Sequence, residues 1–189
     1  VLPIGLHKDF ISHVPVRDHF LTGADMAGKL KGRTKFSHKG HYGHALLIAG
    51  SYGKMGAAVL ASQACLRSGV GLLHAHVPRL GYTILQTAVP EAMVSIDPEE
   101  EHFSRLPELS PYSAIGIGPG IGFAPQTRNS LKLLIQNTPV PLLFDADAIT
   151  VLGENRTWLS FVPKNSIYTP HPKEFERISE KARNDHHRI

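Results

Sequence analysis

The fold class is decided by residues 45–57, which read Ala45-Leu46-Leu47-Ile48-Ala49-Gly50-Ser51-Tyr52-Gly53-Lys54-Met55-Gly56-Ala57. They open with a continuous apolar run of strand length, as expected for a strand that is buried on both faces of a sheet. Small and polar residues follow. Residues 56–68 then carry apolar side chains at helical spacing, with Gly69 placed to end a helix. The stretch therefore predicts a strand, a tight turn and a helix.

The same pattern recurs along the chain. Apolar runs predict further strands at 72–77, 93–96, 114–117, 140–144 and 166–169. Helices are predicted over 83–89, over 127–137 and from Pro172 onward. Strands that alternate with helices predict an α/β fold with a doubly wound, mostly parallel sheet and helices on both faces. The pattern leaves the strand order open.

Length and composition set further bounds. The chain has 189 residues and a net charge of +4, which suits one domain with a sizeable core. The single Cys65 excludes an internal disulfide framework and is predicted to be a small buried hydrophobe. No apolar run approaches the roughly 18 residues of a membrane span, and no signal-peptide pattern is present. We therefore expect a cytoplasmic protein that binds no membrane.

One basic cluster lies within residues 29–39. It lacks the interleaved aromatic residues of a single-strand binding surface, so we expect no nucleic-acid partner. A solvent-exposed arm is the favoured interpretation of this cluster. Electrostatic attraction of a phosphorylated ligand ranks second, ahead of nucleic-acid binding. The cluster falls at the end of residues 1–38, which are predicted to be a lead-in segment broken by Pro3 and Pro15.

Two glycine-rich turns are candidate ligand sites at one edge of the predicted sheet. The first is an anion-binding loop at a predicted helix N-terminus, with Lys54 as an available charge, and its spacing is not that of a P-loop. The second does not fit the dinucleotide fingerprint, which disfavours a hydride-transfer enzyme, but its glycines allow a flat or phosphorylated group to approach closely. For both turns the alternative is a tight turn without a ligand. The glycine and serine positions are Gly50, Ser51, Gly53 and Gly56 in the first turn, and Gly116, Gly118, Gly120 and Gly122 in the second.

Polar residues follow the later predicted strands. We expect one of Asp145 and Asp147 to cap a helix and the other to serve the site, by holding Mg²⁺ through water or by bonding a substrate hydroxyl. His171 and Glu174 lie three residues apart across a helix start and can face one ligand. Zinc is disfavoured because no third ligand is evident. No nucleophile elbow or Ser-His-Asp order supports acyl transfer.

Taken together, these residues resemble the NAD(P)H-hydrate dehydratase family, which has a ribokinase-like fold. The resemblance spans roughly residues 38 to 178, and its motifs occur in the family's order. They are Lys39-Gly-His-Tyr-Gly-His, Gly50-Ser51 through Gly56-Ala57, Ser68-Gly69-Val70-Gly71, Pro90-Glu91-Ala92-Met93, Gly118-Pro119-Gly120-Ile121-Gly122, Asp145-Ala146-Asp147-Ala148 and Thr169-Pro170-His171-Pro172-x-Glu174.

The resemblance implies dehydration of the S form of hydrated NADH or NADPH. The implied chemistry uses ADP or ATP with Mg²⁺ to phosphorylate the hydrate hydroxyl, and loss of phosphate then restores NAD(P)H. Ala57, Gly122 and His171 match positions that contact the hydrated dinucleotide, and Gly118 and Gly120 frame that loop. Glu174 matches the acidic residue that organises Mg²⁺ and phosphate. A homo-oligomer is expected, and Leu2-Pro3-Ile4-Gly5-Leu6 resembles the segment that follows a fused epimerase domain.

The chain departs from the family pattern at one end. The family's Gly-Ser/Thr-Gly-Asp motif and Lys-Gly nucleotide segment do not occur before Ile189. We therefore expect residues 39–189 to form the N-terminal and central part of the domain, with the catalytic Asp beyond Ile189 and this chain alone inactive. Another ribokinase-like small-molecule kinase and an inactive dinucleotide-binding fragment remain as alternatives.

Overall fold

A computed structural model of the chain describes residues 5–16, 20–29 and 32–179. The chain divides into two compact units, Val1–Ser37 and His38–Ile189. The described part of the first unit contains two short helices, α1 (Lys8–His13) and α2 (Gly23–Ala27), and neither buries a side chain. No pattern in the sequence predicted these helices. None of the helices in the described residues is long and apolar enough to cross a membrane.

The second unit is built on a six-stranded sheet in the order β3-β2-β1-β4-β5-β6. Every neighbouring pair of strands is parallel, which confirms the predicted parallel α/β sheet. All six strands lie where the apolar runs predicted them, within two residues at each end. Their bounds are β1 His44–Ile48, β2 Leu72–Val77, β3 Met93–Ile96, β4 Ala114–Ile117, β5 Leu142–Phe144 and β6 Ile167–Tyr168.

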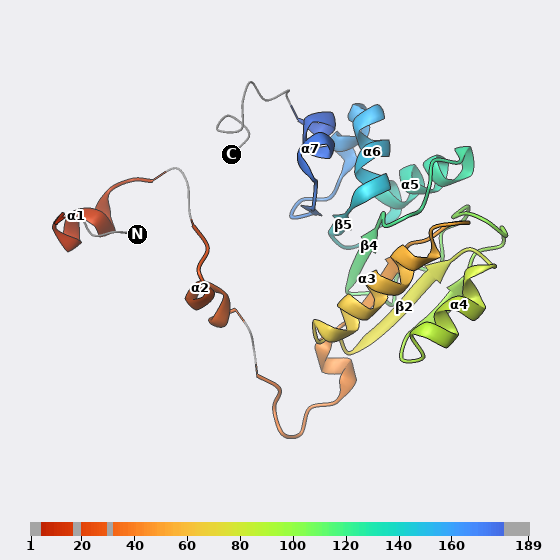
Figure 1. The fold of residues 1–189 in the computed structure, drawn as a ribbon, viewed down its shortest axis with the longest axis horizontal. Coiled ribbons are helices and arrows are strands. Elements are labelled where there is room, and N and C mark those ends of the chain that lie inside the picture. The colour runs from red at the N-terminus through yellow and green to blue at the C-terminus, as the bar shows by residue number, and fades with distance from the viewer. Residues whose placement is uncertain (1–4, 17–19, 30–31, 180–189) are drawn as a thin grey trace. The chain divides into compact units, whose positions relative to one another are not determined.

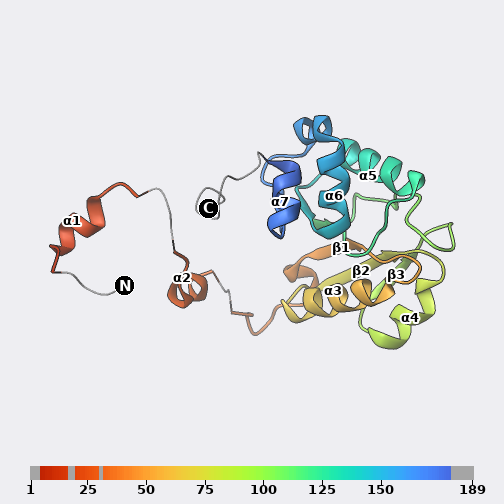
Figure 2. The same cartoon turned by 45° about the horizontal axis from the view of Figure 1, so that its top comes forward.

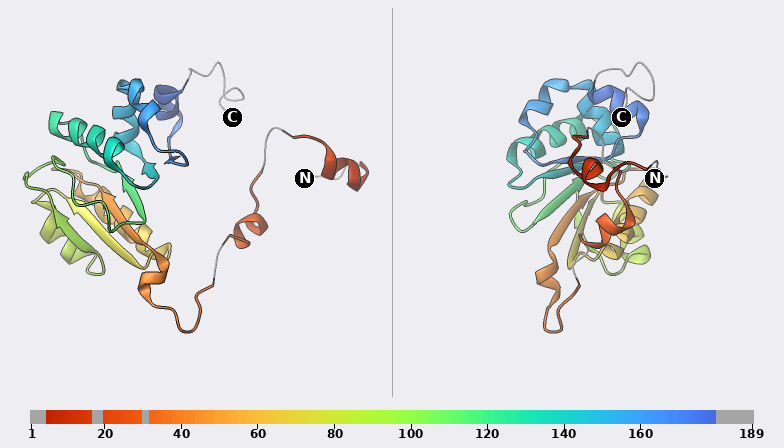
Figure 3. Two further views of the ribbon diagram at one scale, coloured as in Figure 1. Left: turned by 180° about the vertical axis from the view of Figure 1, so that it is seen from behind. Right: turned by 90° about the vertical axis from the view of Figure 1, so that its left-hand side faces the viewer.

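Helices cover the two faces of this sheet in separate layers. Helices α3 and α4 pack on one face of the sheet, and α5 and α6 pack on the other, as the rotated view shows (Figure 2). Helix α7 lies beside α6 (Figure 1), and the same layers can be followed from behind (Figure 3). Two short 3₁₀ helices, η1 and η2, complete the unit. The bounds are η1 Lys39–Tyr42, α3 Met55–Arg67, α4 Gly81–Ala88, α5 Pro125–Asn137, α6 Ala146–Glu154, η2 Arg156–Phe161 and α7 Pro172–Ile178.

Alternation along each strand sends its side chains to the two layers. Leu46 and Ile48 of β1 enter the core beneath α5 and α6, whereas Leu47 packs toward the core beneath α3 and α4. On the face that carries α3, Leu143 of β5 and Ile167 of β6 are 40% and 58% exposed. An apolar hollow of about 520 Å³ lies between α3 and β1, β4 and β5. The described residues therefore leave this part of the α3 face open.

Cys65 of α3 is partly buried against the core beneath α3 and α4, in agreement with its predicted role as a small hydrophobe. Burial raises the pKa of its thiol. The thiol is thus kept in its neutral, less reactive form.

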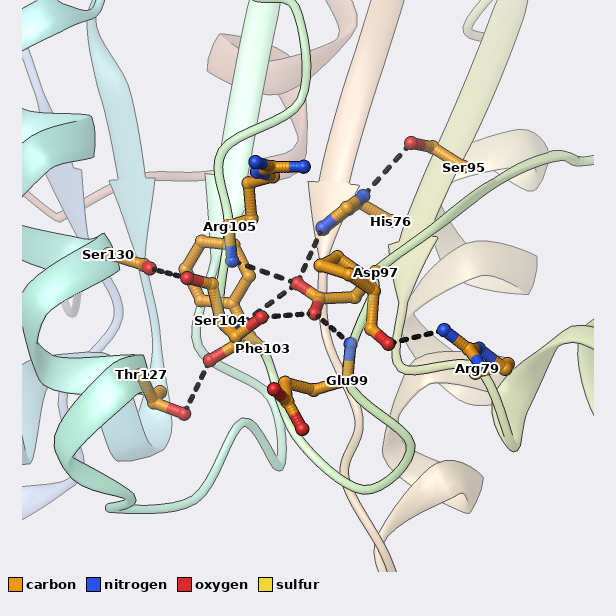
Figure 4. Close-up of polar contacts among 11 residues, drawn as sticks. His76, Arg79, Ser95, Asp97, Glu99, Phe103, Ser104, Arg105, Thr127 and Ser130 are labelled. Carbon is orange, nitrogen blue, oxygen red and sulfur yellow. Dashed lines mark hydrogen bonds and ion pairs between the residues drawn. The ribbon is translucent and has the colours of Figure 1, made fainter.

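The connection between β3 and β4, residues 97–113, contains no helix or strand and is organised by one buried carboxylate. Asp97 accepts hydrogen bonds from the backbone N–H groups of Glu99, Ser104 and Arg105, at 2.9, 2.8 and 3.0 Å. The Ser104 hydroxyl and His76 Nε2 also donate to it, at 2.5 and 3.2 Å (Figure 4). Because the side chain is fully buried, these donors replace water around the charge.

The balance of these contacts keeps Asp97 ionised. Burial alone would raise the pKa of the Asp97 carboxyl, but hydrogen bonds from His76, Ser104 and Glu99 together hold it well below its ordinary value. Helix α5 fixes the same connection from the other side, since Thr127 and Ser130 donate to the carbonyl oxygens of Phe103 and Ser104.

We predict that Asp97→Ala lowers the free energy of unfolding by about 3–5 kcal/mol, because it leaves the buried His76 and several part-buried donors without an acceptor. Denaturant unfolding of the chain measures this loss. Glu108→Ala is the matched control, because Glu108 is an exposed carboxylate of the same connection that bonds only the exposed Ser110. It should change stability by no more than about 0.5 kcal/mol.

The loss should depend on pH in a defined direction. The folded pKa lies below the ordinary 3.8, so the stability from Asp97 is present above about pH 4 and is lost as the pH falls through the folded pKa. The difference in free energy of unfolding between wild type and Asp97→Ala should therefore become smaller in acid. Equal stability of wild type and Asp97→Ala near neutral pH would contradict this account.

Candidate functional site

The order of the strands places a candidate site between β1 and β4. Strand order reverses there, and in open α/β sheets ligands bind beyond the carboxyl ends of the strands at such a switch point. Both glycine-rich turns leave the sheet at this point. The Gly50 N–H donates to the Pro119 carbonyl at 2.8 Å, and the buried Ser51 hydroxyl donates to the Gly120 carbonyl at 2.7 Å. The two turns thus form one bonded unit.

Gly118 shows why the second turn needs glycine. Its φ is +137°, and a Cβ atom added there would lie 1.8 Å from the Asp145 carbonyl oxygen. The turn therefore packs backbone against backbone at the end of β5. Gly120 is similarly tight, because an added Cβ would lie 3.0 Å from Lys54 Cβ and 3.1 Å from Ala57 Cβ. This contact brings the second turn against the start of α3.

Gly56 differs from these glycines. It lies in the first turn of α3, and a Cβ atom added there would meet no atom within 4 Å. Space is thus open in front of the helix N-terminus, beside Ala57. Lys54 occupies the N-cap position and makes no side-chain cap bond. The positive dipole end of a helix at such a place favours an anion, although the Ala57 N–H already donates to the Lys54 carbonyl at 3.1 Å.

Asp147 joins the two turns to α6. Its Oδ2 atom accepts a hydrogen bond from the Gly122 N–H at 2.9 Å and pairs with Lys54 Nζ at 3.0 Å. The Asp147 side chain is 18% exposed and that of Lys54 is 46% exposed. One carboxylate therefore fixes the end of the second glycine turn and holds the lysine at the mouth of the site.

Asp145 has a different partner. It stands at the N-cap position of α6 but makes no side-chain cap bond, and instead its Oδ1 atom accepts the Thr169 hydroxyl at 2.8 Å. Asp147, in the first turn of the same helix, does not cap it either. The expectation that one of the two caps a helix through its side chain is therefore wrong. Tertiary partners, Thr169 for one and Lys54 with Gly122 for the other, take both carboxylates.

His171 and Glu174 follow β6 and bind each other at the start of α7. His171 Nδ1 accepts the Lys173 N–H at 3.2 Å, while Glu174 accepts the His171 N–H at 3.1 Å, which forms a capping box. His171 Nε2 lies 3.0 Å from Glu174 Oε1. Glu174 is buried, whereas the His171 side chain is 58% exposed. No hydrogen bond between described residues joins His171 or Glu174 to the glycine turns. Those turns follow β1 and β4, whereas His171 and Glu174 follow β6.

The described residues do not form a complete metal site. No group of three or more His, Cys, Asp or Glu side chains among them is placed to hold a metal ion. Both Glu174 oxygens are engaged by His171, so its expected role toward Mg²⁺ is limited to an indirect one through water.

Phe123 was not singled out from the sequence. It directly follows Gly122, is 42% exposed, and has Lys54 Nζ and the Arg128 guanidinium within 6 Å of its ring centroid, at 5.3 and 5.8 Å. An aromatic residue directly after a glycine run was the available signal. The site mouth thus combines an exposed ring with positive charge.

We predict that Asp147→Ala frees the end of the second glycine turn. The Gly122 N–H loses its acceptor, so its amide hydrogen exchange should accelerate by at least about tenfold. Lys54→Gln is the matched control: it removes the ion pair but keeps the bond to Gly122, and a partly exposed pair contributes only about 0–1 kcal/mol. Exchange followed by NMR measures both. Equal acceleration in the two variants would assign the restraint to the ion pair instead.

Comparison with known proteins agrees with this arrangement. A sequence model of the NAD(P)H-hydrate dehydratase family matches residues 45–189. The ADP-dependent (S)-NAD(P)H-hydrate dehydratase of Staphylococcus aureus is 37% identical over 149 residues, covering 78% of this chain and 52% of that protein. The bifunctional NAD(P)H-hydrate repair enzyme Nnr of Moorella thermoacetica is 33% identical over 186 residues, covering 94% of this chain and 35% of that protein.

Solved structures show the same fold. The ADP/ATP-dependent NAD(P)H-hydrate dehydratase of Bacillus subtilis, co-crystallised with ATP and Mg²⁺, superposes with a TM-score of 0.65 at 30% identity, covering 84% of this chain and 55% of that one. A ribokinase-like superfamily protein from Enterococcus faecalis has a TM-score of 0.68 at 24% identity, covering 86% and 60%. The chain thus spans about a third of the length of the Moorella enzyme and about half of the length of the S. aureus enzyme. The order of the motifs, the sheet and the family match agree: the chain belongs to the NAD(P)H-hydrate dehydratase family.

Proposed function

We propose that the protein carrying this chain removes water from the S form of hydrated NADH or NADPH and so restores NAD(P)H. Phosphorylation of the hydrate hydroxyl by ADP or ATP, followed by loss of phosphate, would drive the reaction. The observation that carries this proposal is the bonded pair of glycine turns at the switch point, which coincides with the motifs shared with the family. The activities of the S. aureus and B. subtilis relatives support it.

The geometry suggests a division of work within the site. Gly50, Ser51 and Gly118 build the rigid base, because their backbone and side-chain contacts are satisfied within the protein. The open first turn of α3 at Gly56 and Ala57 would receive the dinucleotide, and the positive dipole end of the helix suits a phosphate group. Lys54 would add a positive charge beside that position.

The second glycine turn and α7 would border the nicotinamide end of the ligand. Gly120 and Gly122 present backbone next to Ala57 and Asp147, which allows a flat ring to approach closely. His171 is exposed enough to contact the ligand while still capping α7. Asp145 and Asp147 would serve by holding these segments in place, and Gly53 by turning the chain toward α3.

ADP or ATP with Mg²⁺ is proposed as the co-reactant. The S. aureus relative is ADP-dependent, and the B. subtilis one is ADP/ATP-dependent. When bound, Mg²⁺ would neutralise phosphate charge. The described residues supply no complete set of direct ligands for Mg²⁺. Glu174, which is paired with His171, would therefore help to position the ion through water. We place the general base outside this chain.

Two further proposals concern partners and setting. The match to the Moorella enzyme covers 94% of this chain and so extends into residues 1–38, which supports fusion to an epimerase domain. A homo-oligomer is proposed on the resemblance alone, and a cytoplasmic setting is proposed because no apolar run approaches the length of a membrane span. No nucleic-acid partner is proposed, because the basic residues near 29–39 are accompanied by one exposed ring, Phe36, and a single ring does not make a stacking platform.

The test is an assay of the natural protein that carries this chain, with hydrated NADH, Mg²⁺ and either ADP or ATP. We expect reduced-nicotinamide absorbance to return with release of one phosphate per NADH restored. A phosphorylated hydrate that accumulates without phosphate release would instead indicate a small-molecule kinase. Binding of the hydrate without turnover would indicate a binding module, and either result would contradict the proposal.

A further inference from the structure

Three hydrogen-bonded polar side chains lie away from the switch point, on β2 and on and directly after the edge strand β3. The Ser95 hydroxyl is 2.9 Å from His76 Nδ1, and His76 Nε2 is 3.2 Å from Asp97 Oδ2 (Figure 4). His76 and Ser95 are register partners on parallel strands, and Asp97 directly follows β3. The sequence shows no motif for this arrangement because strand pairing brings its members together.

The hydrogen bonds define the state of the imidazole. Asp97 accepts three backbone N–H groups and the Ser104 hydroxyl, an environment that suits a carboxylate, so we assign the proton of the His76–Asp97 pair to His76 Nε2. In the neutral imidazole, Nδ1 is then free to accept the Ser95 proton. The Phe103 ring packs edge-on against the imidazole, with ring centroids 5.6 Å apart, and fixes its orientation. A nucleophile, a base and an orienting carboxylate are thus aligned.

Ser95 and His76 border a hollow of about 220 Å³. Arg105 also lines it, and its guanidinium points to the same side of the network as Ser95 and His76 (Figure 4). The backbone N–H of Arg105 is bound to Asp97, while its side chain is exposed. A cation here can stabilise negative charge that develops on an ester oxygen. The volume suits a small group rather than a dinucleotide.

We propose that Ser95 is an activated nucleophile that accepts acyl groups from small esters, at a site separate from the hydrate site. Ser95 Oγ would form a bond to the ester carbonyl carbon, and the bond from that carbon to the alkoxy oxygen would break. The hydroxyl proton would pass to His76 Nδ1 and then to the departing alkoxide. No oxidant or further reactant is needed. This inference does not depend on the proposed dehydratase activity.

The test uses a fluorophosphonate probe, with which Ser95 Oγ would form a bond to phosphorus as fluoride leaves. The probe is incubated with the chain, and the modified residue is located by peptide mass spectrometry. We expect modification at Ser95 in the wild type and none at this position in Ser95→Ala. Ser110→Ala is the matched control, because Ser110 is an exposed serine bonded only to Glu108, and it should react as wild type does.

A second variant separates reactivity from folding. Arg105→Gln keeps the backbone bond to Asp97 and should fold as wild type, yet it should slow both labelling and acetylation by p-nitrophenyl acetate several-fold. Labelling that is absent from wild-type Ser95, or that falls on other residues at equal rates in wild type and Ser95→Ala, overturns the proposal. So does an unchanged Ser95 labelling rate in Arg105→Gln.

Discussion

The hydrogen bond from the Gly50 N–H to the Pro119 carbonyl is the contact on which the candidate site depends. It joins the turn after β1 to the turn after β4, and these are the two strands between which the sheet order reverses. Because Gly118 packs without a side chain against the Asp145 carbonyl, the end of β5 is held to the same point. Asp147 then attaches α6 through Gly122 and Lys54. Three strand ends and one helix therefore share a single rigid edge.

A second constraint reaches this edge from the far side of the sheet. Asp97 orders the connection between β3 and β4, and the Glu101 carbonyl of that connection accepts the Tyr52 N–H at 2.7 Å. Tyr52 belongs to the first glycine turn, between Ser51 and Gly53. The buried carboxylate therefore supports the site indirectly, through backbone contacts. This link explains why a long connection without regular structure is nonetheless fixed by so many polar contacts.

Much of the fold follows from local pattern in the sequence. Each strand is a short, mainly apolar run, and all six were predicted from it because strands of a parallel sheet are largely buried. The two edge strands, β3 and β6, are nevertheless partly exposed. Strand order could not be predicted, since it depends on pairing between distant segments. Helix α6 was not delimited from the sequence, because Ile149, Thr150 and Val151 are β-branched and have low helix propensity, and burial against the core outweighs that preference.

The site was predictable in part for the same reason. Glycine spacing and the placement of turns after strands indicated which segments meet, and the structure places the two turns in direct contact. The partners of Asp145, Asp147 and Asp97 were not predictable. Each binds groups that are distant in sequence or in an irregular segment, and local capping propensity pointed elsewhere.

The most direct measurement is the affinity of Gly56→Ala for hydrated NADH, taken together with its free energy of unfolding, in the natural protein that carries this chain. The space around Gly56 is open, so the added methyl group should leave stability unchanged or raise it by up to about 1 kcal/mol. If a ligand approaches the first turn of α3, affinity should nevertheless fall by at least about tenfold. Wild-type affinity in a stably folded variant would contradict the placement of the ligand at this turn.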